Sequence, residues 1–519
     1  MNKKAVKTIG LIMFIILISK LLGLVREMFL AGYYGAGIEA AAFSTAADIP
    51  LKFFDLAFGA AVTSTFIPVF NKYLKNDDTD GGFLFASRFI NIIFLLTAVL
   101  AVIGIIFSEQ LIVLFLPGGS SEVQALASQL LKILFPTAIM AGLAFSMVSI
   151  LQSMGQFTIP AMISLFPNVL TIIYLIFLNK HYGIVGLAVT FLIAWMMQVL
   201  IQIPFIKRKN FIYTPSMRFN DPGIKKVSKM VLPILIGSWV TPVSLFMLGA
   251  FASFMGDESV AAIKYANRLY LILAGIFVFA MMNYLFPLMS RQAEDSDPEP
   301  FNNTYRRAFE SVVFFIIPLS VGAYLLSPNL ISIVYERGAF TAENALLTAR
   351  AFAGFCPAIF GYSLYEITSK AYYARKKVIA PTIMSVLTLV VAFTLSYVVV
   401  FRTELDLGYV SLAFSIGITL AAIILVILFN RSTGGILKGR STAELVKGII
   451  GSSMMGVAVL LFKTLIIDKS NAGLGVELLL VLAAVLIGLT VYAVMMALLK
   501  SPTFAYYYKW AKEKIGKGN

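Results

Sequence analysis

Residues 40–70, AAAFSTAADIPLKFFDLAFGAAVTSTFIPVF, have a counterpart in residues 260–290, VAAIKYANRLYLILAGIFVFAMMNYLFPLMS. Both stretches follow a short glycine-containing loop and end in a proline just before a polar exit. These two prolines, Pro68 and Pro287, are 219 residues apart, and two further pairs of prolines are 221 residues apart. The near-constant offset predicts an internal repeat of apolar segments.

The composition is typical of a membrane protein. The chain has 519 residues, of which 59% are hydrophobic and only 13% are charged, and its mean hydropathy is +0.89. Soluble domains are about a quarter charged. Apolar runs of the roughly 20 residues that a spanning helix needs fill nearly the whole chain, and the alternation of a membrane β-barrel is absent from the sequence. We therefore predict an all-α polytopic membrane protein.

About fourteen transmembrane helices are predicted. The first apolar run is too long for a cleaved signal peptide and carries Lys20 and Arg26. The predicted spans are residues 8–30, 41–71, 84–107, 125–151, 158–178, 184–206, 230–254, 260–289, 308–327, 345–373, 380–401, 408–429, 445–467 and 475–499.

The basic residues are distributed unevenly between the predicted loops. With the N-terminus inside, the inner segments hold 28 of the 41 lysines and arginines, and the outer loops hold seven. Because cytoplasmic loops carry an excess of lysine and arginine, both termini are predicted to be cytoplasmic. The same rule accounts for the net charge of +15, so no nucleic-acid partner is predicted.

The repeat predicts two six-helix lobes. Its offset is six spans, an even number, so the halves share one orientation and form parallel repeats about an axis along the membrane normal. The predicted organisation is an N-lobe at 1–206, a basic cytoplasmic linker at 207–229, a C-lobe at 230–430, and two C-terminal helices with a basic tail at 431–519.

Several charges fall inside predicted spans, where ionisable groups usually face the protein interior or a water-filled cavity. The cations are Lys20, Arg26, Lys52, Lys132, Arg268 and Lys370, and the acids at similar depth are Asp48, Asp55 and Glu366. Glu366 and Lys370 are four residues apart, so they are expected to neutralise each other. Asp48 and Lys52 have the same spacing, and Lys132 is near enough to a helix end to reach the headgroups.

Arg26 and Arg268 have no local partner of that kind. Glu27 adjoins Arg26, but helix neighbours one residue apart are expected to point in different directions. Arginine's planar fork is suited to bidentate binding of phosphate. A wet cavity with excess positive charge would attract an anionic substrate, and these two arginines are the leading candidates to bind it.

The predicted chemistry is binding and passage, not bond breaking, so the chain is not expected to be an enzyme. The one histidine, His181, lies in a predicted outer loop, and the one cysteine, Cys356, cannot form an intramolecular disulfide. A histidine-based catalytic site is therefore not expected. Neither a metal site nor a cofactor is predicted.

Five motifs resemble one known family. In chain order they are SKLLGLVREMFLAGYYGAGIEAAAF at 19–43, FIPVF at 66–70, YANRLYLILAGIF at 265–277, YERGAFT at 335–341 and KAYYARKK at 370–377. Together they resemble the MurJ, or MviN, family of the multidrug/oligosaccharidyl-lipid/polysaccharide exporter superfamily. The resemblance covers the first twelve predicted spans.

This resemblance implies a flippase of the bacterial plasma membrane. It implies that lipid II, the undecaprenyl-pyrophosphate-linked peptidoglycan precursor, moves from the inner to the outer leaflet by alternating access. The implied partners are lipid II, membrane lipids and cell-wall synthesis proteins. The family's cavity cations map onto Lys20, Arg26 and Arg268, and a groove involving the last two spans is implied to hold the undecaprenyl tail.

The chain also departs from its relatives. Many relatives have an aspartate where this chain has Ala41, and arginines where it has Phe54 and Asp55. Lys52, one turn earlier, is a candidate replacement, and no sodium site is carried over. The predicted substrate-binding set is Lys20, Arg26, Lys52, Asp55 and Arg268, with Asp48, Glu366 and Lys370 as secondary cavity charges.

Three alternatives stay open at this stage. A flippase for another undecaprenyl-linked glycan, such as a teichoic or capsular polymer, would have nearly the same sequence features. A drug/cation antiporter of the same superfamily would place carboxylates in the cavity, against the observed excess of cations. A non-transporting scaffold for cell-wall synthesis would tolerate loss of the arginines.

Overall fold

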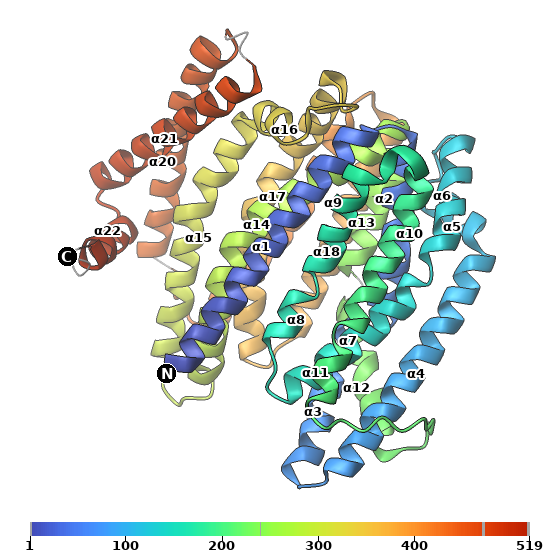
Figure 1. The fold of residues 1–519 in the computed structure, drawn as a ribbon. Coiled ribbons are helices and arrows are strands. Elements are labelled where there is room, and N and C mark those ends of the chain that lie inside the picture. Colours follow the sequence, from blue (N-terminus) through green and yellow to red (C-terminus); the bar gives the residue numbers. More distant parts are fainter. Residues whose placement is uncertain (1–2, 239, 438, 470–472, 516–519) are drawn as a thin grey trace. The chain divides into compact units, whose positions relative to one another are not determined.

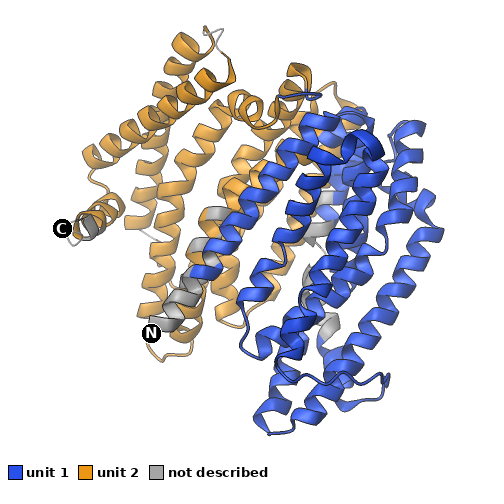
Figure 2. Ribbon diagram, viewed as in Figure 1, with its two compact units in different colours: residues 1–261, 337–340 blue, residues 262–336, 341–519 orange. Residues whose placement is uncertain are grey.

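The computed structural model describes residues 3–238, 240–437, 439–469 and 473–515. Regular structure in these ranges is helical, without a strand, which confirms the predicted all-α class. The chain divides into two compact units, coloured separately in Figure 2. Unit 1 is Met1–Ala261 with Arg337–Phe340, and unit 2 is Ala262–Glu336 with Thr341–Asn519.

Unit 1 is a bundle of long and broken helices, labelled in Figure 1. Its elements are α1 (Lys3–Tyr34), α2 (Ile38–Phe54), the π-helical segment η1 (Asp55–Gly59), α3 (Ala60–Lys75), α4 (Thr79–Ile106), α5 (Ser108–Phe115), α6 (Ser121–Leu134), α7 (Thr137–Ser153), α8 (Thr158–Met162), α9 (Leu165–Phe177), α10 (Asn179–Leu200), α11 (Ile203–Lys207), α12 (Pro222–Ser238) and α13 (Val240–Ser253).

Aromatic rings form the centre of unit 1. The Phe66 ring on α3 lies 5.2 Å from Phe70, 5.4 Å from Phe85 and 4.9 Å from Phe89, measured between ring centroids. Lipid tails are as apolar as these rings, so exclusion from water cannot hold the helices together in a bilayer. Close packing of flat side chains provides the attraction instead.

The segment between α11 and α12 is fastened to α4. Arg88 of α4 forms an ion pair with Asp221 at 2.5 Å, and Asn91 Nδ2 donates to the Ser216 carbonyl at 2.8 Å. Asp221 also accepts from the Gly223 backbone N–H, so the same carboxylate caps the start of α12. The predicted linker is thus held within unit 1, together with α12 and α13.

A second segment of unit 1 comes from much later in the chain. The backbone N–H of Ala339 donates to the Gly32 carbonyl of α1 at 2.8 Å. Gly338 has a φ of +57°, in the left-handed region that side chains rarely adopt. A Cβ at Gly338 would also collide with the Gly32 carbonyl, so the YERGAFT motif contains a glycine that this contact requires.

Unit 2 contains the second half of the chain (Figure 1). Its elements are most of α14 (Asp257–Gln292), then α15 (Glu299–Leu325), α16 (Ser327–Tyr335), α17 (Ala342–Ala374), α18 (Ile379–Arg402), α19 (Leu407–Ser432), α20 (Arg440–Phe462), the π-helical segment η2 (Lys463–Ile467), α21 (Leu474–Leu498) and α22 (Pro502–Ile515). The division between the units lies within α14, after Ala261.

Small residues let the central helices of unit 2 approach closely. A Cβ on Gly417 of α19 would lie 2.7 Å from the Thr388 carbonyl oxygen of α18. Ser415 of α19 donates to the Gly354 carbonyl of α17 at 2.5 Å. Such contacts are the usual means of helix association in membranes, where backbones that come close gain dispersion energy and hydrogen bonds.

A proline in α15 explains how α21 attaches to it. Pro318 has no N–H, so the Phe314 carbonyl four residues earlier loses its helical donor. The Tyr492 hydroxyl of α21 donates to this carbonyl at 2.7 Å. Since no water is present in the hydrocarbon core, the freed carbonyl needs a protein donor. The proline therefore creates a specific attachment point for α21.

The helices account for each predicted span, although the count of fourteen stays a prediction. Among the described residues, nine helices are long and apolar enough to cross a membrane, or ten if the bent pair α6–α7 is one span. They coincide with ten predicted spans. The other four predicted spans coincide with α1, with α2–η1–α3, with α12–α13 and with α14.

Replacing Arg88 with glutamine should release the segment between α11 and α12. The change removes one partner of a largely buried ion pair, which costs about 3 kcal/mol and raises local opening by about a hundredfold. Limited proteolysis with trypsin would measure this as faster cleavage at Arg218. Lys226→Gln, which removes an exposed cation of α12, is the control, and equal cleavage of both variants would contradict the assigned role of Arg88.

Replacing Tyr492 with phenylalanine should destabilise the protein by about 1–3 kcal/mol, because the Phe314 carbonyl loses its donor in an apolar environment. The cost should fall in a Pro318→Ala background, since the new alanine N–H can bond to the same carbonyl. Thermal unfolding of the four proteins of this double-mutant cycle would test the coupling. Tyr397→Phe on the exposed side of α18 is the control. An equal cost in both backgrounds would contradict the explanation.

Candidate functional site

Two of the predicted substrate-binding cations lie on α1. Lys20 and Arg26 are both partly buried. The Arg26 guanidinium pairs with the Glu27 carboxylate at 2.5 Å, and the two side chains are only 17% and 10% exposed. The expectation that these neighbours point apart was wrong. Both side chains are long enough to bend round the helix, and in a low-dielectric environment an ion pair is favoured strongly enough to bend them.

The predicted charges of the second span surround a break in the helix. Lys52 is in the last turn of α2 and Asp55 begins the π-helical segment η1. π-Helical turns are rare and occur frequently at functional sites. A Cβ on Gly59 would lie 2.8 Å from Asp55 Oδ1, so the carboxylate occupies the space that this glycine leaves free. Phe54, between the two charges, is 1% exposed and stacks on Phe145.

The helices that carry these charges, α1 and α2, follow each other in the chain across a short turn and contact each other within unit 1. Asp48, a secondary candidate on α2, is partly buried like Lys52 and Asp55. The arrangement combines cations and carboxylates on one pair of helices. Anion binding by α1 and α2 would depend on which of their cations are already paired with a carboxylate.

Arg268 belongs to unit 2, on α14. Its side chain is exposed, whereas Tyr270 two residues later is buried and stacks on Phe355 at 5.3 Å. Two residues correspond to about 200° around a helix. Arg268 is thus on the side of α14 away from the packed core of unit 2.

Glu366 and Lys370 do not pair as the spacing predicted. The Tyr362 hydroxyl donates to Glu366 at 3.4 Å. The Lys370 ammonium lies over the rings of Phe286 and Tyr373, 5.6 Å and 5.8 Å from their centroids. Aromatic faces attract a cation through their quadrupole, so the two charges of α17 each have a separate partner and neither neutralises the other.

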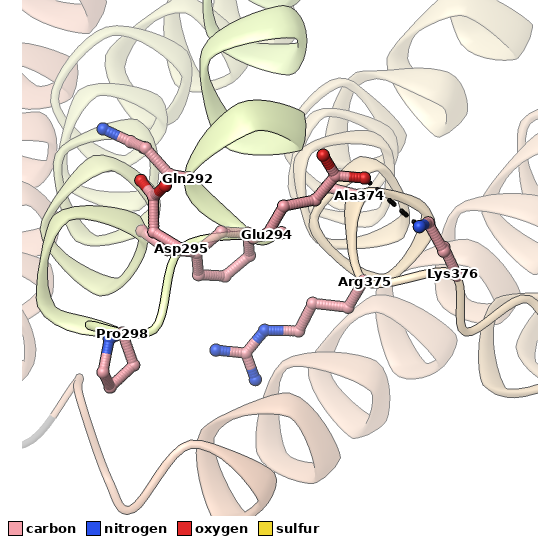
Figure 3. A pocket seen from close by; sticks show the side chains of 9 residues that line it. Gln292, Glu294, Asp295, Pro298, Ala374, Arg375 and Lys376 are labelled. Carbon is pink, nitrogen blue, oxygen red and sulfur yellow. Dashed lines mark hydrogen bonds and ion pairs between the residues drawn. The ribbon is translucent and has the colours of Figure 1, made fainter.

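A pocket of about 270 Å³ at the α14–α15 loop of unit 2, shown in Figure 3, was not predicted from the sequence. Its lining includes Gln292, Glu294, Asp295 and, from the KAYYARKK motif, Arg375 and Lys376. Lys376 pairs with Glu294 at 3.2 Å across the pocket. The acidic run after Gln292, in an otherwise basic set of inner loops, was the signal available in the sequence.

Arg375 is the best-held cation of this pocket. Its guanidinium lies 4.4 Å from the Phe301 centroid and 5.3 Å from that of Phe429, and it donates to Asn302 Oδ1 at 3.3 Å. Burial lowers the pKa of Arg375 from its usual value, although an arginine stays charged at neutral pH. The residue fastens the end of α17 to α15 and α19.

Residues 30–481 match the family model described as lipid II flippase MurJ. A probable lipid II flippase MurJ of Buchnera aphidicola subsp. Baizongia pistaciae is 27% identical over 391 residues, which cover 75% of this chain and 76% of the relative. Its counterpart in Vibrio cholerae is 26% identical over 423 residues, which cover 79% and 80%.

Solved structures agree. A lipid II flippase MurJ in an inward closed conformation superposes with a TM-score of 0.79 at 25% identity, over 94% of this chain and 98% of that one. An inward-facing multidrug resistance MATE family transporter gives a TM-score of 0.70 at 16% identity, over 81% and 96% of the two chains, a likeness of fold alone. Because the family model matches most of its length, this chain belongs to the lipid II flippase MurJ family.

Proposed function

We propose that the protein moves lipid II from the inner to the outer leaflet of the bacterial plasma membrane by alternating access. The observation that carries this proposal is the match of residues 30–481 to the lipid II flippase family. Charged residues inside a spanning helix support it independently, because such residues usually serve a substrate or ion pathway. The family contains transporters, so no covalent chemistry is needed.

In this mechanism Lys20, Arg26, Lys52 and Arg268 bind the pyrophosphate of lipid II. Arginine offers a planar pair of donors to two phosphate oxygens, and lysine adds charge. Before the substrate binds, Arg26 is paired with Glu27. The pyrophosphate then replaces the Glu27 carboxylate as the partner of Arg26, so the guanidinium always has an anion beside it in the membrane. When the substrate leaves, Glu27 can pair with Arg26 again, which makes release easier.

The predicted orientation supplies the direction of the pathway. Both termini are predicted to be cytoplasmic, and in this mechanism the two six-helix repeats alternately open toward each leaflet. The headgroup passes between the repeats while the lipid tail stays in the bilayer, beside the last two spans. Proteins of cell-wall synthesis are the expected partners on either side of this step.

Arg26→Ala and Arg268→Ala should each reduce lipid II flipping by about tenfold to a hundredfold, since a hydrogen bond to a charged group contributes about 1.5–3 kcal/mol. Arg26→Lys should retain part of the activity, because it keeps the charge and loses the fork. Transport of labelled lipid II in vesicles would be measured at equal protein content.

Lys132→Ala is the matched control for these two variants. It also removes a cation from a predicted span, but Lys132 forms an exposed ion pair with Glu109 at 3.2 Å. It should transport normally. Normal transport by both arginine variants would refute the proposed roles of the arginines and leave the flippase assignment in place.

The identity of the substrate is tested separately by complementation. In a bacterium depleted of its own lipid II flippase, the wild-type protein should restore growth and clear inward-trapped lipid II. Quantification of lipid-linked precursors after depletion of the protein in its own host is the second readout. A contrary result would be a protein that inserts normally and still fails to rescue growth, while a teichoic or capsular precursor accumulates in its own host. That result would assign a different undecaprenyl-linked glycan as the substrate.

A further inference from the structure

α22 is a separate helix that follows α21 after only three residues (Figure 1). Lys500, in this connection, has a φ of +51°, a left-handed conformation that turns the chain sharply. The sequence of α22, PTFAYYYKWAKEKI, contains three lysines, one glutamate and four aromatic rings besides its Phe504. It is too polar to continue the span and rich in the residues that favour a membrane surface.

The inner face of α22 is packed against α15. Tyr507 shares a hydrogen bond with the Ser311 hydroxyl at 2.7 Å, and its ring lies 5.9 Å from Phe314 and 5.0 Å from Phe315. Phe504 completes the contact with Phe314. This face is therefore occupied, and the orientation of the helix about its own axis is determined by it.

The start of α22 is held by a buried carboxylate of α20. Glu444 is 2% exposed and accepts hydrogen bonds from the Ser501 hydroxyl at 2.6 Å and from the Thr503 backbone N–H at 3.3 Å. A negative charge at a helix N-terminus is stabilised by the helix dipole. Lys447, which pairs with Glu444 at 3.5 Å, also donates to the Lys500 carbonyl. α22 is thus fastened to both α15 and α20.

The opposite face of α22 is exposed. Ala505, Tyr508, Lys509 and Lys512 are spaced three, four and seven residues from the first, so they lie on one side of the helix. Tyr508 is 62% exposed. An aromatic ring flanked by lysines is the combination found on helices that lie in the membrane interface, where the ring enters the headgroup layer and the lysines meet lipid phosphates.

We propose that this outer face of α22 binds an anionic lipid surface, and that α22 thereby joins α15 and α20 to the headgroups of the inner leaflet. Charge complementarity identifies the occupant, because both lysines on the face are exposed and Lys517 follows α22 in the sequence. Polybasic segments beside a span are drawn to anionic lipids. The proposal rests on the predicted cytoplasmic C-terminus and not on the transported substrate, so it stands or fails separately from the flippase assignment.

The test uses the full chain with Ala505→Cys on the outer face. Cys356, the one native cysteine, is buried, so a thiol-reactive fluorophore should label only the new position. The labelled protein is placed in bilayers of phosphatidylcholine alone or with an equal part of phosphatidylglycerol. Access of the neutral quencher acrylamide to the fluorophore is then measured at low and high salt.

Phosphatidylglycerol should shield the fluorophore, and high salt should reverse the shielding, because exposed charges are screened. Lys509→Gln with Lys512→Gln should shift the bound-to-free ratio of α22 by about thirtyfold toward the free state. Lys225→Gln with Lys226→Gln, two exposed lysines of α12, removes the same net charge and should leave the shielding intact. Equal quenching in both bilayers, or equal effects of the two double variants, would overturn the proposal.

Discussion

A bilayer offers no water to a backbone carbonyl, and much of this structure follows from that constraint. Each proline within a spanning helix frees a carbonyl one turn earlier and so creates a demand for a donor. At Pro318 the demand is met by Tyr492 of α21, across two helices. Pro318, a residue type that would weaken a soluble helix, thereby specifies that α21 packs against α15.

The same scarcity of water governs the charges. Arg26 bends toward Glu27, and Lys370 lies over two aromatic rings in place of the glutamate one turn away. Arg375, at the end of the same helix, also lies on aromatic faces. Arg26 is thus stabilised by a carboxylate, and Lys370 and Arg375 by aromatic rings, which a charge-spacing rule does not consider. Arg268, on the side of α14 away from the core, is the exposed one among the predicted binding residues.

Helices were predictable because a spanning segment is long, apolar and bounded by charge, and these properties are local. Each predicted span coincides with a helix or a broken helix of the structure. The π-helical break at Asp55 was not predictable, since it depends on how α2 and α3 pack as well as on Gly59. Pairing of Arg26 with Glu27 was missed for a related reason: rules for neighbouring residues describe surfaces in water, where bending a side chain to reach its neighbour gains little. The pocket at Arg375 joins segments some eighty residues apart, beyond the reach of any local pattern.

The segment after α11 is fastened to α4. This contact limits where two related proteins can be joined to make a chimaera. The predicted repeat has its boundary at the linker, residues 207–229. The ion pair between Arg88 and Asp221 instead holds this linker, with α12 and α13, in the first compact unit. A chimaera of two relatives that exchanges chains at the repeat boundary would separate Asp221 from its arginine and α12 from its packing partners. An exchange point within the first turn of α14 would keep Arg88, Asp221, α12 and α13 together, while residues 337–340 of unit 1 would come from the other relative. The predicted repeat and the compact unit that packing stabilises are therefore not the same stretch of chain.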